Sequence, residues 1–354
     1  MPPVNRTARV AALRPRYQDD LARGTARFFR PRRTDCPWCG SARLAVRLRT
    51  PDLLQHKPGH FVLERCRDCR HTFQNPQLTD EGLEFYYRDF YDGLGEENLA
   101  TLFGTHERAY RLRAGAVTPH ADPGSWLDVG TGHGHFCAAA RALLPRTVFD
   151  GLDLGAGVAS AQERGWIRRG YRGGFVALAG ELAGRYDVVS MFHYLEHSAD
   201  PGRELAAAHR ALRPGGHLLI EVPDPRCAFG RLLGRWWLPW LQPQHLHLIP
   251  AANLRRRLTD LGFTVVAQEH AQPHDPVDLL TAGWLAVNRL APRRDEPWHP
   301  APPGRARRVL RGAVLAAGVP VLTAGWLLDR LLAPVAHRVG LSNAYRLLVR
   351  REDG

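Results

Sequence analysis

Three glycines alternate with other residues directly after a short apolar stretch that carries a carboxylate. The glycines are Gly130, Gly132 and Gly134. Asp128 precedes them, and a helical pattern from residue 136 to residue 144 follows them. Glycine is favoured where the backbone takes a positive φ, or where a ligand must approach the backbone without meeting a Cβ. A turn of this kind at the start of a helix presents backbone N–H groups to a ligand, so we expect a ligand-binding turn here.

The polar residues around this turn narrow the class of ligand. A dinucleotide-binding turn reads G-x-G-x-x-G, and His135 stands where its third glycine would be. The carboxylate of Asp128 disfavours a pyrophosphate and suits a cationic ligand. A second carboxylate, Asp153, ends the next apolar stretch and can accept hydrogen bonds from the two hydroxyls of a ribose. A purely structural glycine turn in another kind of α/β protein is the alternative interpretation.

Histidines and a glutamate follow two later apolar stretches. His193, Glu196 and His197 come after one stretch, and His245 comes after the next. Histidine exchanges protons near neutral pH, so one of these side chains can remove a proton from an acceptor group. We expect His197 to be the base and Glu196 to orient it or to bind a divalent metal, with His245 as the next candidate. Each histidine is also compatible with an ordinary structural role.

Four of the six cysteines form two C-x-x-C pairs. The pairs are Cys36 with Cys39 and Cys66 with Cys69. Each pair fits a tight turn whose two thiolates point the same way, so the four together offer a tetrahedral set of sulfur ligands. No position stays open for chemistry in such a set, and we expect a structural Zn²⁺ in a zinc-ribbon-like module at residues 34–75. Disulfides or a redox-active pair are the alternative, which a reducing cytoplasm disfavours.

Apolar stretches alternate with helical patterns from residue 125 to residue 270. Strands are expected at 126–129, 148–154, 187–192, 217–222 and 263–267, and helices at 136–144, 201–212 and 252–261. This alternation predicts an α/β fold with a doubly wound, mostly parallel sheet. Ligands bind beyond the carboxyl ends of the strands in such sheets. The glycine turn, Asp153 and the histidines should therefore meet at one edge of the sheet.

Several of these segments are similar to motifs of class I S-adenosylmethionine-dependent methyltransferases of the small-molecule type. Residues 127–134 resemble the first motif of that family, h-[D/E]-h-G-x-G-x-G, while residues 186–201 and 212–223 resemble its fourth-strand and fifth-strand motifs. The resemblance implies a Rossmann-like sheet of seven strands, S-adenosylmethionine as cofactor and transferase activity by methylation. The residues that it assigns to the cofactor are Asp128, Gly130, Thr131, Gly132, Gly134, Asp153, Leu154 and Phe192.

One feature departs from the family pattern. The third strand of the family usually ends in an acidic residue that binds the adenine amino group, and residues 167–171 contain none. How adenine is recognised therefore stays open.

The segments before the core differ in composition. Residues 1–33 contain nine arginines against two aspartates, which predicts a basic, mobile arm. Residues 76–124 contain an aromatic cluster that we expect either to pack a linker helix onto the core or to roof the active site. Its members are Phe85, Tyr86, Tyr87, Phe90 and Tyr91.

The segments after residue 270 are a proline-rich linker with apolar helices at 271–340 and a last strand with a tail at 341–354. Residues 281–292 and 323–334 share eight of twelve positions, which predicts two paired apolar helices. Four arginines between residues 305 and 311 precede the second helix, a charge pattern typical of a helix at an anionic membrane surface. A helical lid over the substrate pocket is equally compatible. The last strand, inferred at 343–350, would make these helices an insertion before the end of the sheet.

Three tryptophans lie within five residues after the strand at 217–222, at positions 236, 237 and 240. They suit ordinary packing, an apolar wall for the acceptor, or an anchor at a membrane interface.

The net charge of +13 comes almost entirely from arginine, because Lys57 is the only lysine. A coding bias explains this pattern as well as a nucleic-acid surface does. The first thirty residues lack the apolar segment of a secretory signal, so we expect a cytoplasmic protein, with peripheral contact at the inner face of the membrane through 305–334 left open.

We expect methyl transfer to an oxygen or carbon of a small metabolite, sugar- or lipid-linked, in cell-surface or natural-product biosynthesis. A tRNA or rRNA methyltransferase is the first alternative. Residues 192–197, Phe-His-Tyr-Leu-Glu-His, differ from the Asn-Pro-Pro-Tyr type of base amino-methylating enzymes, so a nucleic-acid partner is not expected. The second alternative is a non-catalytic scaffold at a membrane that binds S-adenosylmethionine.

Overall fold

A seven-stranded sheet forms the centre of the molecule in this computed structural model, which describes residues 6–90, 107–270, 276–336, 338–339 and 341–352. Across the sheet the strands are β10 (Phe263–Glu269), β11 (Ala344–Arg351), β8 (Leu212–Pro223), β7 (Tyr186–Phe192), β4 (Ser125–Val129), β5 (Val148–Asp153) and β6 (Gly170–Arg172). The five strands from β8 to β6 are parallel to one another, and β11 runs antiparallel to both of its neighbours.

Helices cover both faces of this sheet and bury an apolar core on each. One core lies under α7 (Phe175–Leu178), α8 (Pro201–Ala211) and α10 (Ala251–Asp260). The other lies under α4 (Glu107–Gly115), α5 (His135–Leu143) and α6 (Gly157–Glu163). The central strands β4 and β7 are mostly apolar because both of their faces are buried. The predicted doubly wound α/β fold with seven strands is therefore confirmed, and the chain returns to the sheet through β11 as expected.

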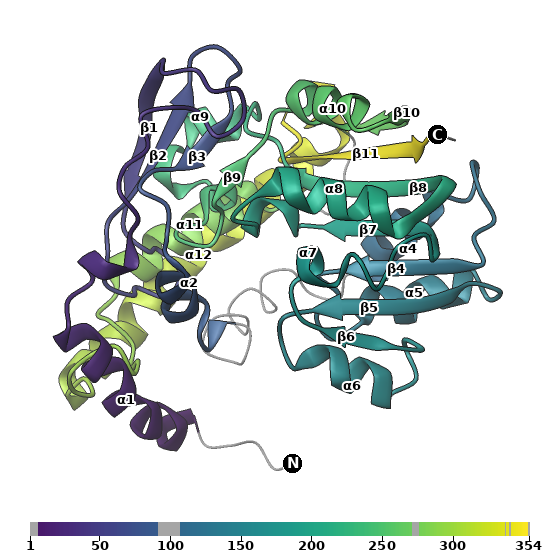
Figure 1. Cartoon of the computed structure of the whole chain (residues 1–354). Helices are drawn as coiled ribbons and strands as arrows, with labels where there is room; N and C mark the ends of the chain where they lie inside the picture. Colours follow the sequence, from purple (N-terminus) through teal and green to yellow (C-terminus); the bar gives the residue numbers. More distant parts are fainter. Residues whose placement is uncertain (1–5, 91–106, 271–275, 337, 340, 353–354) are drawn as a thin grey trace.

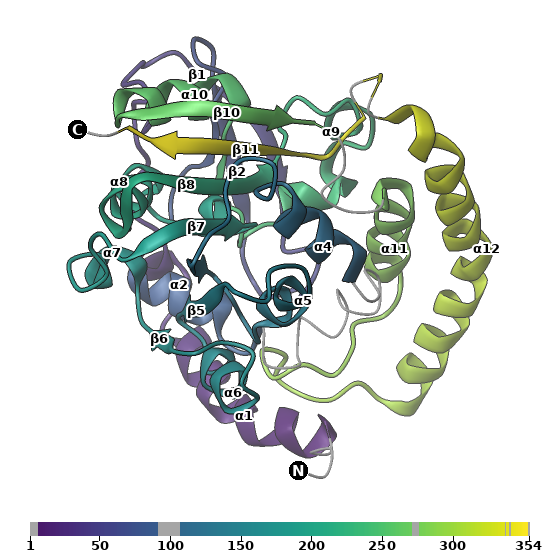
Figure 2. The same cartoon turned by 90° about the vertical axis from the view of Figure 1, so that its right-hand side faces the viewer.

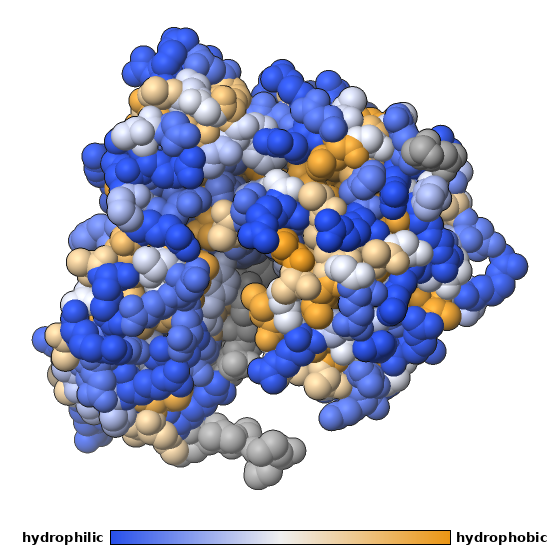
Figure 3. All heavy atoms as spheres, viewed as in Figure 1, coloured by the Kyte–Doolittle hydropathy of each residue, from blue (hydrophilic) through white to orange (hydrophobic). Residues whose placement is uncertain are grey.

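A second, four-stranded antiparallel sheet packs beyond the carboxyl ends of the parallel strands (Figure 1). Three of its strands, β1 (Leu44–Thr50), β2 (Phe61–Cys66) and β3 (Thr72–Gln74), come from the N-terminal module. Its fourth strand, β9 (His247–Leu248), comes from the segment that follows β8. The surface is hollowed between the lobe that holds the small sheet and the lobe that holds the large one (Figure 3).

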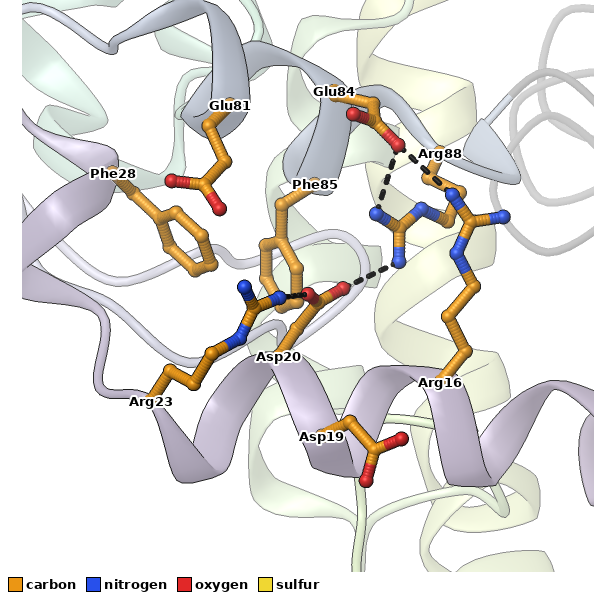
Figure 4. A pocket seen from close by; sticks show the side chains of 9 residues that line it. All are labelled: Arg16, Asp19, Asp20, Arg23, Phe28, Glu81, Glu84, Phe85 and Arg88. Atoms are coloured by element: carbon orange, nitrogen blue, oxygen red, sulfur yellow. Dashed lines mark hydrogen bonds and ion pairs between the residues drawn. The ribbon is translucent and has the colours of Figure 1, made fainter.

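Four of the nine N-terminal arginines lie on a packed helix, which corrects the expectation of a mobile arm. Helix α1 (Arg6–Ala22) buries Val10 and Tyr17 completely. Ion pairs join it to α2 (Asp80–Tyr87) and the residues that follow, as in the hollow of Figure 4, where Asp20 accepts from Arg88 at 2.7 Å. Other arginines of α1 pair with acidic residues at 295–296. The charges therefore serve contacts with segments that are distant in the sequence.

The aromatic cluster at 85–91 divides between the two roles considered for it. Phe85, Tyr86 and Phe90 are buried, the first two in the apolar core beneath α1. Tyr87 instead points toward the histidine cluster described below. Tyr91 lies outside the described residues.

Helices α11 (Asp278–Leu290) and α12 (Arg305–Ala336) pack against each other, as the two related segments predicted (Figure 2). Each copy of the shared sequence contributes a glycine to the contact. A Cβ on Gly283 would lie 3.5 Å from Val321, and one on Gly325 would lie 3.0 Å from the backbone of Leu279. The carboxylate of Asp329 accepts the backbone N–H groups of Leu279 and Leu280 at the start of α11.

The outer side of α12 is exposed and apolar, because α11 lies between α12 and the large sheet (Figure 2). Leu327 and Leu331 are 48% and 73% exposed. Among the described residues, α12 is the one helix long and apolar enough to cross a membrane by length and composition, which is weak evidence by itself.

The tryptophan-rich stretch packs inside the protein. Trp237 and Trp240 are buried, and the indole N–H of Trp237 donates to Asp278 at 2.8 Å. The stretch thus anchors the start of α11 to the segment after α9 (Phe229–Leu232).

Candidate functional site

The glycine turn joins β4 to α5, and all three of its glycines adopt a positive φ. The φ angles are +78° at Gly130, +54° at Gly132 and +76° at Gly134, the residue that caps α5. These angles lie in the left-handed region, which side chains with a Cβ rarely adopt. The turn therefore presents bare backbone at the N-terminus of α5, as predicted.

Asp153 stands at the end of β5, beside the glycine turn. Its Oδ2 accepts the backbone N–H of Gly132 at 2.9 Å, and its Oδ1 accepts that of Gly155 at 2.7 Å. Each carboxylate oxygen can accept a further hydrogen bond, so the side chain can still bind two ribose hydroxyls. The next residue, Leu154, is 72% exposed and leaves an apolar surface beside the carboxylate.

Asp128 is buried beneath the turn rather than displayed on it. It is 3% exposed, and its Oδ1 accepts the hydroxyl of Ser190 at 2.6 Å. Burial raises the pKa of Asp128 to about 6 despite that hydrogen bond. Thr131 is likewise buried and lies near Cys137. These two predicted cofactor residues therefore support the turn from below.

Phe192 ends β7 and is half-buried. Its ring meets the ring of Phe136 edge to face at 4.7 Å, and the guanidinium carbon of Arg113 lies 4.6 Å from its centre. The residue thus lies against α5, the helix that the glycine turn opens.

His193 bridges two buried carboxylates at the point where the chain leaves β7. The residue has a φ of +50°, and its Nδ1 lies 3.0 Å from Oε1 of Glu196 and its Nε2 3.3 Å from Oε1 of Glu221. Burial would lower the pKa of His193, but the hydrogen bonds to both carboxylates raise it to about 9. Both ring nitrogens face carboxylate oxygens, so we expect His193 to position Glu196 rather than to act as a base.

Glu221 lies inside β8, fully buried, and holds this network together. It pairs with Arg113 at 2.5 Å and with Arg346 of β11 at 2.9 Å. Burial would raise the pKa of Glu221, but Arg113 and His193 hold it well below its usual value. Sequence reasoning missed this residue, although a carboxylate within a strand buried on both faces was the available signal.

Glu196, His197 and His245 form a compact cluster next to His193. One potential ligand atom from each lies within 4.8 Å of the others. The rings of His197 and His245 meet edge to face at 4.6 Å. Burial lowers the pKa of both histidines, that of His245 to about 3, so both are neutral at pH 7. The structure thus brings together the predicted base His197, the predicted orienting residue or metal ligand Glu196 and the next candidate His245.

Residues 244–248 connect this cluster to the N-terminal module. The hydroxyl of Tyr87 lies 3.0 Å from Nδ1 of His197 and donates to the carbonyl of Gln244 at 2.7 Å. The backbone N–H of Leu246 donates to the carbonyl of Glu196, and β9 then pairs with β3. The sequence offered no sign of this strand pairing.

The four cysteines of the N-terminal module lie at the tips of two similar turns. The backbone N–H of Gly40 donates to the carbonyl of Cys36, and that of Arg70 donates to the carbonyl of Cys66. The sulfur of Cys36 lies 3.6 Å from that of Cys69, and the sulfur of Cys39 lies 3.6 Å from that of Cys66. These separations exclude disulfides and approach the edge of about 3.8 Å of a tetrahedron with metal–sulfur bonds of about 2.3 Å. The cysteines therefore fit a Zn²⁺ ion.

Known proteins match the central part of the chain. Residues 104–268 match a family described as a methyltransferase domain. The ubiquinone biosynthesis O-methyltransferase of Azotobacter vinelandii is 32% identical over 128 residues, and that of Pseudomonas putida is 28% identical over 128 residues. Both matches cover 34% of this chain and 54% of the relative, so the chain spans about half the length of these relatives.

Among solved structures, a SAM-dependent methyltransferase from Archaeoglobus fulgidus superposes with a TM-score of 0.47 and 14% identity. The superposition covers 72% of this chain and 99% of that one.

The glycine turn, the carboxylate at the end of β5 and the family match lie in the same part of the chain. The backbone cradle and Asp153 fit an S-adenosyl ligand, as the resemblance implied. From residue 104 to residue 268 the chain is a class I S-adenosylmethionine-dependent methyltransferase domain.

Proposed function

We propose that the whole protein transfers a methyl group from S-adenosylmethionine to an oxygen or carbon of a small acceptor that is sugar- or lipid-linked. The observation that carries the proposal is that Tyr194 joins the cofactor turn to the cluster of Glu196, His197 and His245. Its ring lies so close to Gly130 that a Cβ there would be 2.8 Å away, and the cluster begins two residues later. Two matched relatives are named O-methyltransferases, which favours an oxygen acceptor.

Different residues of this site would bind the cofactor and remove the proton of the acceptor. S-adenosylmethionine supplies an activated methyl group on a sulfonium. The glycine turn would hold its amino-acid part, and Asp153 would hold its ribose. The acceptor must lose a proton, and the neutral histidines are suited to take it.

The hydrogen bonds of His197 show which nitrogen is available. Its Nδ1 lies 3.1 Å from the carbonyl of Gln244, which can only accept, so Nδ1 carries the proton. The lone pair is then on Nε2. We propose His197 as the acceptor of the proton, with Tyr87 and the Gln244 carbonyl fixing its ring.

Transfer of labelled methyl groups tests this proposal. The full-length protein is incubated with S-adenosylmethionine labelled in its methyl group and with the lipid, small-metabolite and nucleic-acid fractions of a cell extract. We expect label in a lipid or small-metabolite product. His197→Gln should lower the transfer rate about 100-fold or more, because a positioned acid or base contributes on that scale. The exposed His120→Gln is the control. Label in the nucleic-acid fraction alone would contradict the proposal.

We also propose that the four cysteines hold a structural Zn²⁺. The support is the near-tetrahedral spacing of the four sulfurs and the absence of any bond between them. The metal content of the purified protein tests this, and about one zinc per chain is expected. Much less than half an equivalent would contradict it.

We further propose that α12 binds the surface of an anionic membrane. Its outer side is apolar, and Arg305, Arg307 and Arg308 at its start are exposed, so hydrophobic and charge complementarity coincide. Spanning is disfavoured because α12 packs along α11 and leads directly into β11, which keeps both of its ends with the globular part.

Sedimentation with lipid vesicles tests this surface. We expect binding to phosphatidylglycerol vesicles that weakens with salt, and little binding to phosphatidylcholine vesicles. Leu331→Asp should abolish binding, whereas Leu232→Asp should not, because Leu232 is equally exposed but lies on α9. A wild-type protein that stays in the supernatant with both lipids would rule the proposal out.

A further inference from the structure

Glu196, His197 and His245 each place one potential ligand atom within 4.8 Å of the others, and the hydrogen bonds of the two histidines indicate which nitrogen of each keeps a lone pair. His197 donates from Nδ1 toward the carbonyl of Gln244. His245 donates from Nδ1 to the carbonyl of Pro239 at 2.7 Å. Because a carbonyl can only accept, both Nδ1 atoms carry the proton, and both Nε2 atoms keep a lone pair.

The third member of the cluster has an unsatisfied oxygen. Glu196 is 1% exposed, its Oε1 is bound by His193, and its Oε2 has no hydrogen-bond partner among the described residues. Burying a carboxylate oxygen without a hydrogen-bond partner costs free energy. Such an oxygen therefore usually has a partner, which can be a water molecule or an ion. Here the unpaired oxygen belongs to a set whose other two members also present lone pairs.

The surroundings of the cluster are also typical of a metal site. Histidines that bind metals usually donate their other N–H to a carbonyl or carboxylate, which orients the ring. His197 and His245 both donate to backbone carbonyls, and Glu196 is fixed in turn by His193. Two ligand atoms that bind one ion at about 2.1 Å lie about 3 Å apart. The potential ligand atoms of this cluster already lie within 4.8 Å of one another, so small side-chain movements would let them bind one ion.

We propose that Glu196, His197 and His245 bind a divalent first-row metal cation that leaves further coordination positions open toward the acceptor. This site is distinct from the four-cysteine cluster, and its two nitrogens and one oxygen suit Mn²⁺, Fe²⁺, Co²⁺ or Zn²⁺.

The inference rests on the proposed methyl transfer and changes the role proposed for His197 in it from base to metal ligand. An acceptor hydroxyl held by the cation loses its proton to solvent more readily. Its oxygen then forms a bond to the methyl carbon while the carbon–sulfur bond breaks and leaves its electron pair on sulfur. His197 acts as a ligand in this scheme, and the proton leaves without it.

Metal titration of the zinc-loaded, full-length protein tests the site. Mn²⁺ is the first probe, because it prefers nitrogen and oxygen to thiolates, and the loss of the free-ion signal in electron paramagnetic resonance reports binding. Co²⁺, which imidazole binds more strongly, is the second probe. We expect one saturable site per chain for at least one of them, and a higher melting temperature when it is filled.

Variants separate this site from other metal sites. Glu196→Gln and His245→Gln should each weaken binding of the probe at least about 10-fold, and His193→Gln about 10-fold, because it removes only the group that orients Glu196. His120→Gln should bind the probe as the wild type does. Calorimetric binding of S-adenosylmethionine, unchanged in each variant, shows that the domain is folded.

The outcomes distinguish this inference from the proposed function. A protein that binds S-adenosylmethionine but neither Mn²⁺ nor Co²⁺, and whose methyl transfer is insensitive to both, overturns the metal site and leaves the proposed function standing. Probe binding that survives both Glu196→Gln and His245→Gln also overturns it. A protein that binds the metal but transfers no label to any extract fraction contradicts the proposed function alone.

Discussion

The two clusters of potential metal ligands in this protein differ in how complete they are. The N-terminal cluster has four sulfur atoms from two local turns, which is the full set of ligands for a tetrahedral ion. The second cluster has one carboxylate and two histidines, drawn from the segments after β7 and β8. A closed set can only stabilise structure, whereas an open set beside a cofactor turn can bind a reacting group. The number of potential ligands therefore distinguishes the proposed structural site from the proposed chemical one.

The two clusters are nevertheless connected through one short strand. β9 completes the sheet of the cysteine module and follows His245 by a single residue. His71 of the module also hydrogen-bonds His247 at 3.0 Å. The cysteine module thus helps to fix the position of His245. Loss of a metal ion from the four cysteines should therefore disturb the cluster of Glu196, His197 and His245.

Removing a cysteine ligand should have the largest effect. Cys66→Ser should abolish zinc binding and destabilise the N-terminal sheet by more than about 5 kcal/mol, because structural zinc contributes about 10–16 kcal/mol to small domains. Metal analysis and thermal unfolding measure both. Cys227→Ser is the matched control, since Cys227 is also buried but lies outside the cluster. If Cys66→Ser kept its zinc, the closed cluster would be wrongly assigned.

Glu221→Gln tests whether the buried ion pairs of Glu221 support the cluster of Glu196, His197 and His245. The change leaves Arg113, Arg346 and His193 as buried cations without their shared carboxylate, and we expect a loss of about 3–5 kcal/mol. Chemical denaturation measures it. Asp122→Asn, which breaks an exposed pair with Arg146, should change stability by less than about 1 kcal/mol. Equal effects of the two variants would show that the network does not support the cluster.

Asp128→Asn tests whether a functional carboxylate costs stability. Burial raises the pKa of Asp128 to about 6, so its favourable contribution is complete below about pH 4 and is lost as the pH rises through 6. The variant should therefore gain stability at pH 7.5, by at most about 3 kcal/mol, and little near pH 4. Denaturation at the two pH values measures the difference. A variant less stable than the wild type at pH 7.5 would contradict the expected sign.

Asp153→Asn should have the smallest effect and locates the cofactor relative to the two clusters. Loss of hydrogen bonds from the ribose to a charged group should weaken binding of S-adenosylmethionine about 10- to 100-fold. Calorimetry measures this, with the exposed Asp260→Asn as the control. The zinc content should stay unchanged in both variants. If Asp153→Asn and the wild type bound S-adenosylmethionine with equal affinity, the assignment of the cofactor to this edge of the sheet would be wrong.

Much of the fold was predictable because its signals are local. The central strands β4 and β7 each contain a short apolar run, and the glycines of the turn are required by their own backbone angles. The two C-x-x-C pairs likewise carry their geometry within four residues each. Helix α1 was missed because its arginines pair with carboxylates such as Asp295 and Glu296, nearly 300 residues away.

The sequence by itself determined the donor half of the site, namely the glycine turn, Asp153 and the methyltransferase resemblance. Only the tertiary structure decided the acceptor half. A histidine is a base, a ligand or a packed ring according to which of its nitrogens donates, and that depends on carbonyls such as those of Gln244 and Pro239. The tertiary structure also placed Glu196 and Glu221 at the two ring nitrogens of His193, which favours a positioning role for that predicted catalytic histidine. The contacts with Gln244 and Glu221 join distant segments, so no local pattern encodes them.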